Sequence, residues 1–430
     1  MHPDYNNYII MMFLPDLISR EQAYEFLQDK VNTELALFLS AIVKGNIETS
    51  KKFIIKGQFT QLQRAIEDIG EGSDFTRELA AEAIARLQIE SGIDDLIQIL
   101  QNPFTRPTFR TAVMHALADS ATSDAVDALC HFIADKTQSS NIRYDAALAL
   151  AKINSPAVQK CFKERLDRPE QTDCMVLSAA VTAFADFGVA EDVPKLLALY
   201  DSEWSQYGLI GESVITALAG IGNEQSIQYL VNQLQSTTAP VWLEATLQGL
   251  TDNVLKQNVF AGRGVGHALQ LVRSTEVNEA ALIKALLYIG HCGSKVHVTH
   301  LLALFPKLNL SRSSLAAIVE TFGLLADSQS LELLLQIFTE QIDLYQAFWA
   351  KQGIQESEII EDYDLRQWSH AYKDGQEIYE IAVVCRKTLV ALARIDDEVA
   401  FTAIDRILDD ENLKNLHAAA LNTFAKLDCP

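Results

Sequence analysis

The amino-acid sequence predicts an all-α protein, an α-solenoid in which about nine short helix pairs form a right-handed superhelix. Three observations lead to this prediction. A segment of small residues recurs roughly every 34 residues, and apolar residues within each copy follow helical spacing. The 430 residues also contain only 10 prolines and 19 glycines, and no linker divides them. Because each unit of a repeat array contacts only its neighbours, such a chain lengthens without splitting into globular domains.

The recurring segment ends the first helix of each unit and has the form of Ala149-Leu150-Ala151-Lys152-Ile153. From residue 83 to 116 and from 116 to 149 is 33 residues; from 149 to 183 and from 183 to 217 is 34; from 217 to 285 is 68, twice 34. The copies begin at Ala83, Ala116, Ala149, Ala183, Ala217, Ala285, Ala391 and Thr423. This regularity predicts one structural unit per period.

Each unit has the same predicted parts. A first helix, such as residues 75–87, carries Leu and Ala at helical spacing, and a turn such as Ser91-Gly92 follows it. A second helix, such as residues 93–100, has Leu and Ile at positions i, i+3, i+4 and i+7. The alanines of the first helices allow neighbouring helices to approach closely, and stacking of the pairs supplies the core.

This pattern resembles the short HEAT repeats of phycobilisome-lyase-like proteins, over roughly residues 75–340 and 376–430. The signature motifs of tetratricopeptide and ankyrin repeats, which have a similar period, are absent from the sequence. The resemblance implies a HEAT-like solenoid whose second helices line its concave side. It also implies an alternative function, described below, because related proteins include bilin lyases.

Three parts of the chain depart from the period. Residues 1–72 lack the motif and predict an atypical N-terminal helical cap, with helices over 18–29, 32–43 and 58–69. Residues 73–340 form the main array, and residues 376–430 form the C-terminal repeats. Residues 341–375 form an insertion that interrupts the repeat.

The 341–375 insertion combines aromatic with acidic residues. Long insertions in repeat arrays often lie on the binding face, and Tyr and Trp dominate interface hot spots. We therefore predict partner contacts by Trp349, Tyr363, Trp368 and Tyr372. The alternative is that these aromatic rings pack against the solenoid and hold the insertion in place.

A second aromatic group predicts a groove for a peptide or helix of a partner. Tyr200, Trp204 and Trp242 fall at the ends of second helices and in the loops that follow. The alternative is that these rings fill wide gaps between repeats.

The charge balance bears on the class of partner. Lys and Arg number 35 against 57 Asp and Glu, a net charge of −22. Binding to nucleic acid or to anionic lipid relies on Lys and Arg, so the balance argues against both. It favours a protein partner that has a basic patch.

Localisation is inferred from the ends, the cysteines and the hydropathy of the chain. The apolar run at residues 8–14 lacks the features of a signal peptide, and no stretch is long enough for a membrane span. The six cysteines are scattered without a paired motif, which is typical of reduced core residues. The sequence therefore predicts a cytoplasmic protein.

Several groups of residues were weighed as chemical sites. His291, Cys292, His297 and His300 lie within ten residues, and the sequence leaves open whether they bind metal. The glycine-rich segment 262–266 follows no predicted strand, so a mobile loop is favoured over a phosphate site. Paired aspartates such as Asp94-Asp95, Asp396-Asp397 and Asp409-Asp410 are interpreted as helix caps. No catalytic residue, metal site or cofactor is predicted.

The function predicted from the sequence is a non-enzymatic interaction scaffold or adaptor. Its acidic concave surface and the 341–375 insertion would together hold a protein partner. The alternative implied by the HEAT-like resemblance is a bilin lyase or tetrapyrrole chaperone that acts on a phycobiliprotein. In that case the tetrapyrrole would lie against Tyr200, Trp204 and Trp242.

Overall fold

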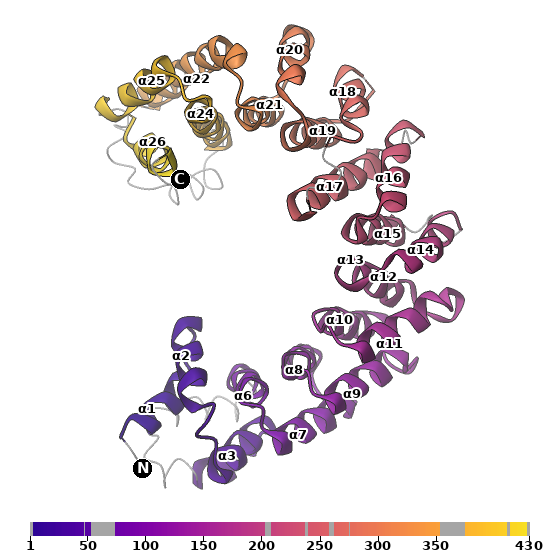
Figure 1. Cartoon of the computed structure of the whole chain (residues 1–430). Helices are drawn as coiled ribbons and strands as arrows, with labels where there is room; N and C mark the ends of the chain where they lie inside the picture. Colours follow the sequence, from indigo (N-terminus) through magenta and orange to yellow (C-terminus); the bar gives the residue numbers. More distant parts are fainter. Residues whose placement is uncertain are drawn as a thin grey trace. The chain divides into compact units, whose positions relative to one another are not determined.

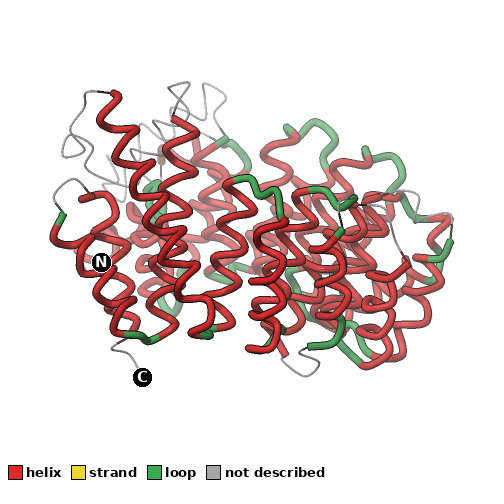
Figure 2. Tube along the Cα trace, turned by 90° about the horizontal axis from the view of Figure 1, so that it is seen from above, coloured by secondary structure: helices red, strands yellow, loops and turns green. Residues whose placement is uncertain are grey.

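A computed structural model describes residues 3–46, 48–52, 74–202, 208–236, 240–257, 262–274, 276–352, 375–410 and 413–427. Every regular element in these ranges is a helix, and none of the described residues forms a strand (Figures 1 and 2). The helices come in pairs stacked along the chain in the manner of HEAT-type repeats. The predicted all-α solenoid is thereby confirmed.

The chain divides into two compact units, residues 1–217 and residues 218–430, which are described separately. Within each unit, the first helices of successive repeats pack against one another and form a first-helix layer. The second helices form a second-helix layer that covers it.

In unit one, the first helices are α6 (Phe75–Arg86), α8 (Pro107–Ser120), α10 (Ser140–Ala151), α12 (Cys174–Thr182), α13 (Phe184–Phe187) and most of α15 (Gly208–Ile221). Their second helices are α7 (Glu90–Gln101), α9 (Ser123–Ala134), α11 (Pro156–Leu166) and α14 (Val193–Tyr200). Short 3-10 helices at Pro169–Gln171 and Ala190–Asp192 complete the loops of this unit.

In unit two, the first helices are α17 (Pro240–Gln257), α19 (Glu279–Cys292), α21 (Arg312–Leu325), α24 (Gly375–Ile395) and α26 (Lys414–Leu427). The second helices are α16 (Glu224–Ser236), α18 (Val265–Arg273), α20 (Lys295–Leu304), α22 (Leu331–Gln352) and α25 (Glu398–Asp409). Short 3-10 helices lie at Phe305–Lys307 and Ser328–Ser330.

The core of the array is built from the recurring small residues. The first residue of the motif is at most 4% exposed in every copy that the structure describes fully, and these copies begin at Ala83, Ala116, Ala149, Ala183, Ala217, Ala285 and Ala391. Since a methyl group occupies little space, successive first helices lie in direct contact, as at α6–α8 and α19–α21. The alanines that define the period are therefore the residues that set the spacing of the layer.

The N-terminal segment contains α1 (Pro3–Met11), α2 (Leu17–Leu27) and α3 (Thr33–Val43). The helices predicted over 18–29 and 32–43 are confirmed, while the one predicted over 58–69 lies outside the described residues. Asp16 and Asn32 cap α2 and α3 by accepting hydrogen bonds from backbone N–H groups in the first turn of each helix. Helix α3 packs directly against α6 and α7.

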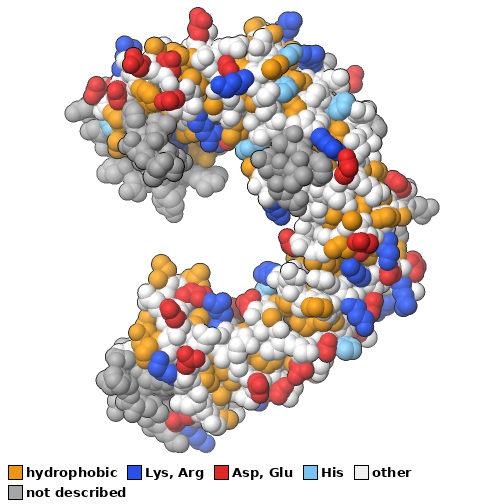
Figure 3. Space-filling model, viewed as in Figure 1, with side chains coloured by type: hydrophobic (Ala, Val, Ile, Leu, Met, Phe, Trp, Pro, Cys, Tyr) orange, Lys and Arg blue, Asp and Glu red, His pale blue; other side chains and the backbone are white. Residues whose placement is uncertain are grey.

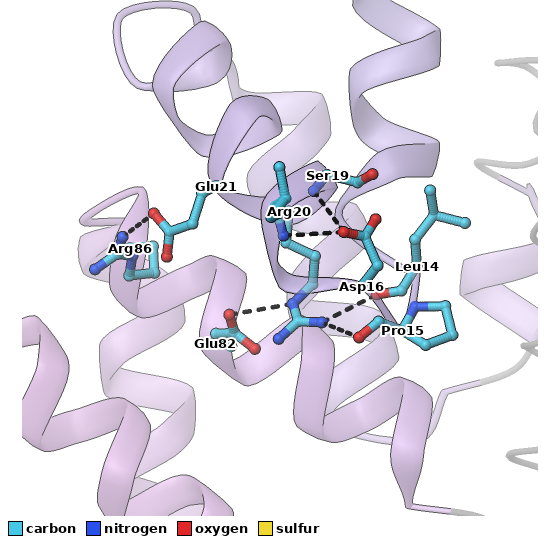
Figure 4. Close-up of polar contacts among 9 residues, drawn as sticks. Leu14, Pro15, Asp16, Ser19, Arg20, Glu21, Glu82 and Arg86 are labelled. Atoms are coloured by element: carbon cyan, nitrogen blue, oxygen red, sulfur yellow. Dashed lines mark hydrogen bonds and ion pairs between the residues drawn. The ribbon is translucent and has the colours of Figure 1, made fainter. Parts of the chain in front are cut away.

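Arg20 links this segment to the first repeat (Figure 4). Its guanidinium donates to the carbonyls of Leu14 and Pro15 at 3.1 and 2.8 Å. It also donates to the carboxylate of Glu82 in α6 at 3.3 Å. One arginine therefore holds both the turn before α2 and the surface of α6, and a second ion pair joins Glu21 to Arg86.

The interpretation of the paired aspartates as helix caps is wrong for Asp95. It lies inside α7, which begins at Glu90, so it does not cap a helix. Its buried carboxylate instead receives a hydrogen bond from Ser40 of α3 and pairs with Lys44 at 2.6 Å. Asp397 behaves as predicted and caps α25 through the N–H of Val399 at 2.8 Å.

None of the helices within the described ranges is both long and apolar enough to cross a lipid bilayer.

Candidate functional site

Helices α22 and α25 of unit two border a groove of about 660 Å³ on the second-helix layer, which we call the α22–α25 groove. The helices are consecutive second helices, and they contact each other only weakly compared with the first helices beneath them. Phe338 and Ile342 from α22 face Val399, Ala403 and Ile407 from α25 across it. Val399 is 56% exposed although it is apolar, so the groove offers apolar surface to solvent.

The charged residues that line the α22–α25 groove are Glu398, Asp410 and Arg406. Over the exposed surface of the two helices as a whole, acidic residues outnumber basic ones. The exposed acidic residues of the two helices are Glu332, Glu340, Asp343, Glu398, Asp405 and Asp409, against Lys351 and Arg406 as the exposed basic ones. Figure 3 shows hydrophobic side chains over α22 and α25 with acidic side chains around them. At one end Gln346 donates to Asp410 at 3.0 Å and joins the two walls. The groove is thus apolar inside and lies between two helices whose exposed charges are mainly acidic.

The predicted insertion begins within a helix. Helix α22 runs continuously to Gln352, so residues 341–352 extend a repeat helix. Trp349 is 5% exposed, and its ring meets Phe348 and Tyr345 edge-on, with ring centroids 5.3 and 6.0 Å apart. The ring of Trp349 therefore packs inward. This corresponds to the alternative in which the aromatic rings pack against the solenoid instead of contacting a partner. Tyr363, Trp368 and Tyr372 lie outside the described residues.

The described residues of the second aromatic group belong to two different units. Tyr200 ends α14 in unit one, and Trp242 stands near the start of α17 in unit two. Both rings are half-buried, and burial, followed by the nearby charge of Asp201, raises the pKa of Tyr200. Trp204 lies outside the described residues.

The histidines near residue 297 have structural contacts. The backbone N–H of Ser294 donates to Nδ1 of His297 at 2.8 Å, so His297 caps the start of its own helix α20. Nδ1 of His300 lies 3.1 Å from the carbonyl of Val296. Cys292 is buried, and that burial raises its pKa to about 12. No group of three or more metal-ligating side chains occurs among the residues that the structure describes.

The glycine-rich segment is a turn before α18. Gly262 and Gly264 have φ values of +90° and +84°, which side chains rarely adopt. Gly264 also lies against Val231, where an added Cβ would come within 3.3 Å. The carbonyl of Arg263 accepts a hydrogen bond from the hydroxyl of Tyr288. These contacts account for the two glycines by backbone geometry and packing.

Two features of the molecule were not predicted from the sequence. The sequence of α22 contains a signal for the α22–α25 groove. Its apolar stripe is wider than the burial of one helix face requires, and it consists of Leu334, Leu335, Phe338 and Ile342. The other feature is a set of arginines 33 residues apart in the first helices, Arg77, Arg110 and Arg143. Repetition at the period of the motif was the available signal.

Comparisons with known proteins do not assign the chain to a family. No protein-family model and no curated protein matches the chain. Among solved structures the chain is similar to importin beta, with 11% identity and a TM-score of 0.41 over 98% of this chain and 73% of that one.

Two further solved structures are similar. One is a Kap121p mutant, with 12% identity and a TM-score of 0.36 over 98% of this chain and 49% of that one. The other is Kap121p bound to Ste12p, with 11% identity and a TM-score of 0.34 over 99% and 57%. The chain spans about half the length of these Kap121p chains. Identities and TM-scores this low carry no argument about function.

Proposed function

We propose that this protein is a non-enzymatic, cytoplasmic interaction scaffold whose α22–α25 groove binds an amphipathic helix of a protein partner. The observation that carries the proposal is an apolar groove between two helices whose exposed side chains include six acidic and two basic ones. The partner helix would place apolar side chains in the groove and basic side chains at its edges. This is the basic partner that the net charge of −22 favours.

The dimensions of the α22–α25 groove suit such a helix. Helix α25 has 12 residues, which at 1.5 Å per residue gives a wall about 18 Å long, or about three turns of a partner helix. Anchors on a partner helix recur at i, i+3, i+4 and i+7, so three turns present about four apolar side chains. Removing exposed Val399 and its neighbours from water would supply the affinity, and the acidic side chains on the two helices would set orientation and association rate.

Other contacts remain part of the proposal. Tyr363, Trp368 and Tyr372 would add aromatic contacts to the same partner, as the composition of residues 341–375 suggests. The bilin-lyase alternative depends on Tyr200, Trp204 and Trp242, of which Trp204 lies outside the described residues. The α22–α25 groove is the described feature that favours a scaffold.

The test uses a fluorescein-labelled amphipathic peptide of Leu, Ala and Lys, about 15 residues long, with anisotropy as the readout. Val399→Lys should weaken binding at least about tenfold, because it removes an apolar contact and repels the basic peptide. The matched control is Val296→Lys. Val296 is 67% exposed and is likewise the second residue of a second helix, α20, but it lies outside the groove.

Equal dissociation constants for the two variants would remove the α22–α25 groove from the proposal. A peptide with the same composition but no amphipathic face is also required. If it binds as tightly as the amphipathic one, the acidic surface acts by charge alone and the groove is not a helix-binding site.

A further inference from the structure

A second groove of about 390 Å³ lies on the first-helix layer of unit two, between α21 and α24, and we call it the α21–α24 groove. Val383, Lys387, Val390 and Arg394 line it from α24. Their spacing of four, three and four residues places them along one face of the helix. Apolar and basic side chains therefore alternate along one wall.

Close contact of the two helices forms the floor of this groove. A Cβ added to Gly323 would come within 2.7 Å of the Cα of Ala391 and 2.8 Å of its Cβ, so the backbones meet here without intervening side chains. The longer side chains at the edges stand above this floor. A segment bound in the groove would touch apolar surface below and charged groups beside it.

The charge of this groove is opposite to that of the chain as a whole. Arg386, Lys387 and Arg394 line it, against one acidic residue, Glu320. Lys387 pairs with Glu320 at 2.8 Å, and both side chains remain partly exposed, at 42% and 30%. Arg394 is exposed and forms no ion pair within the described part of the chain. In a protein of net charge −22, three cations around one small groove are a local exception.

We propose that the α21–α24 groove binds an acidic peptide segment in which Asp or Glu alternates with apolar residues. Its carboxylates would pair with Arg394 and Lys387, and its apolar side chains would lie on Val383 and Val390. This site goes beyond the proposed function, because it lies on the other layer and selects the opposite charge. A scaffold with both sites holds two different partners, or two segments of one partner.

The chemistry of the α21–α24 groove favours a peptide over a nucleic acid. Nucleic-acid binding depends on many phosphate contacts, and the remaining charge of the chain would repel a polyanion. Arg394 and Lys387 are enough to pair with two carboxylates of a short peptide. The valines and the Gly323–Ala391 floor match short apolar side chains, which a phosphate backbone does not offer.

The probe is a fluorescein-labelled peptide of about 12 residues that alternates Asp with Leu, and the full chain is titrated into it near 0.15 M salt. Lys387→Gln with Arg394→Gln should weaken binding by about tenfold or more, since each lost charge-assisted pair contributes to affinity. The matched control is Lys256→Gln with Arg273→Gln, two exposed cations of unit two outside the groove. This control changes the net charge equally and should leave binding within about twofold. Thermal unfolding of both variants verifies that they fold.

Three results would overturn the proposal. Equal weakening by the two double variants would show that net charge, not the groove, governs binding. Equal binding of the peptide in which Asn replaces Asp would show that the carboxylates are not recognised. Displacement of the peptide by inorganic phosphate, at the ionic strength of a chloride control, would assign the cations to phosphate. Each result leaves the test of the α22–α25 groove unaffected, because that test uses a basic peptide and different variants.

Discussion

Single arginines connect successive repeats in unit one. The guanidinium of Arg77 donates to the carbonyl of Val43 at 2.9 and 3.0 Å and lies 4.0 Å from the ring centre of Phe109 in the next first helix. One repeat later, Arg110 is 4% exposed, and one repeat beyond it Arg143 reaches Asp173 at 3.3 Å. Burial lowers the pKa of Arg77 and of Arg110. The positive charge of each buried guanidinium is therefore stabilised by the groups that it contacts.

Arg110 allows this role to be tested. It donates to the carbonyls of Asn102 and Thr105 at 2.7 and 3.3 Å, and to the side chain of Gln138 at 3.2 Å. We expect Arg110→Ala to lower the free energy of unfolding by about 2 to 3 kcal/mol, because a buried charged donor and its three part-buried hydrogen bonds are lost. Urea denaturation followed by circular dichroism measures the loss.

The neighbouring Arg106 provides the control for Arg110. Its side chain is 61% exposed and lies 3.6 Å from Asp74, so Arg106→Ala should cost less than about 1 kcal/mol. Arg110→Lys should recover only part of the loss, since an ammonium does not span three acceptors as a guanidinium does. Similar costs at both positions would show that Arg110 contributes no more than a surface ion pair.

At the scale of elements, helix spacing depends on which residue stands where two helices cross. Helices of the first-helix layer meet at small residues, and the backbones of α21 and α24 are in close contact at Gly323 and Ala391. The second-helix layer has no such contact between α22 and α25, and the α22–α25 groove opens there. The same repeat thus gives one tightly packed layer and one with an accessible apolar gap.

Gly323→Ala tests the close approach of α21 and α24. Alanine favours a helix over glycine by about 1 kcal/mol, yet here its Cβ would meet the backbone of Ala391, which cannot move aside. We expect a net loss of about 1 to 3 kcal/mol in the free energy of unfolding. Gly266→Ala in α18 is the control, because nothing lies within 4 Å of its added Cβ and it should stabilise by up to about 0.5 kcal/mol. A stabilising effect of both substitutions would contradict the close approach.

At the scale of the whole molecule, net charge and local charge differ. The chain carries −22, and the α22–α25 groove agrees with that sign whereas the α21–α24 groove opposes it. A basic peptide is therefore attracted both by the general field and by its own groove. An acidic peptide is repelled by the field and attracted only at close range.

Salt should separate these contributions. Raising ionic strength from about 0.01 M to about 0.15 M shortens the Debye length from about 30 Å to about 8 Å. The affinity of the basic peptide should fall about tenfold or more, while that of the acidic peptide should change less than about threefold, because repulsion and attraction are screened together. Anisotropy titrations along a salt series measure both slopes. Parallel slopes would mean that the field of the whole chain does not distinguish the two grooves.

The sequence alone determined the stacked helix pairs and their period, because these depend on features local to each repeat. The size of a side chain at Ala83 or Ala285 limits how closely helices approach, and Asp16 and Asn32 satisfy the first amides of their own helices. Such signals act within a few residues and can be read before the fold is known. These local signals did not indicate the burial of Trp349. The composition of residues 341–375 predicted that this ring lies at an interface, whereas its neighbours in α22 bury it.

Only the tertiary structure decided where the grooves lie and which charge each one has. Ile342 and Ala403 are about sixty residues apart, and no local pattern shows that their helices leave a gap. Residues on one helix diverge by about 100° per position, so helix phase turns Lys387 and Arg394 towards the α21–α24 groove. Helix packing then brings Glu398 and Asp410 to the edge of the other groove. The net charge of −22 is a sum over the whole chain and does not depend on helix phase or helix packing. It therefore does not reveal two surfaces of opposite sign.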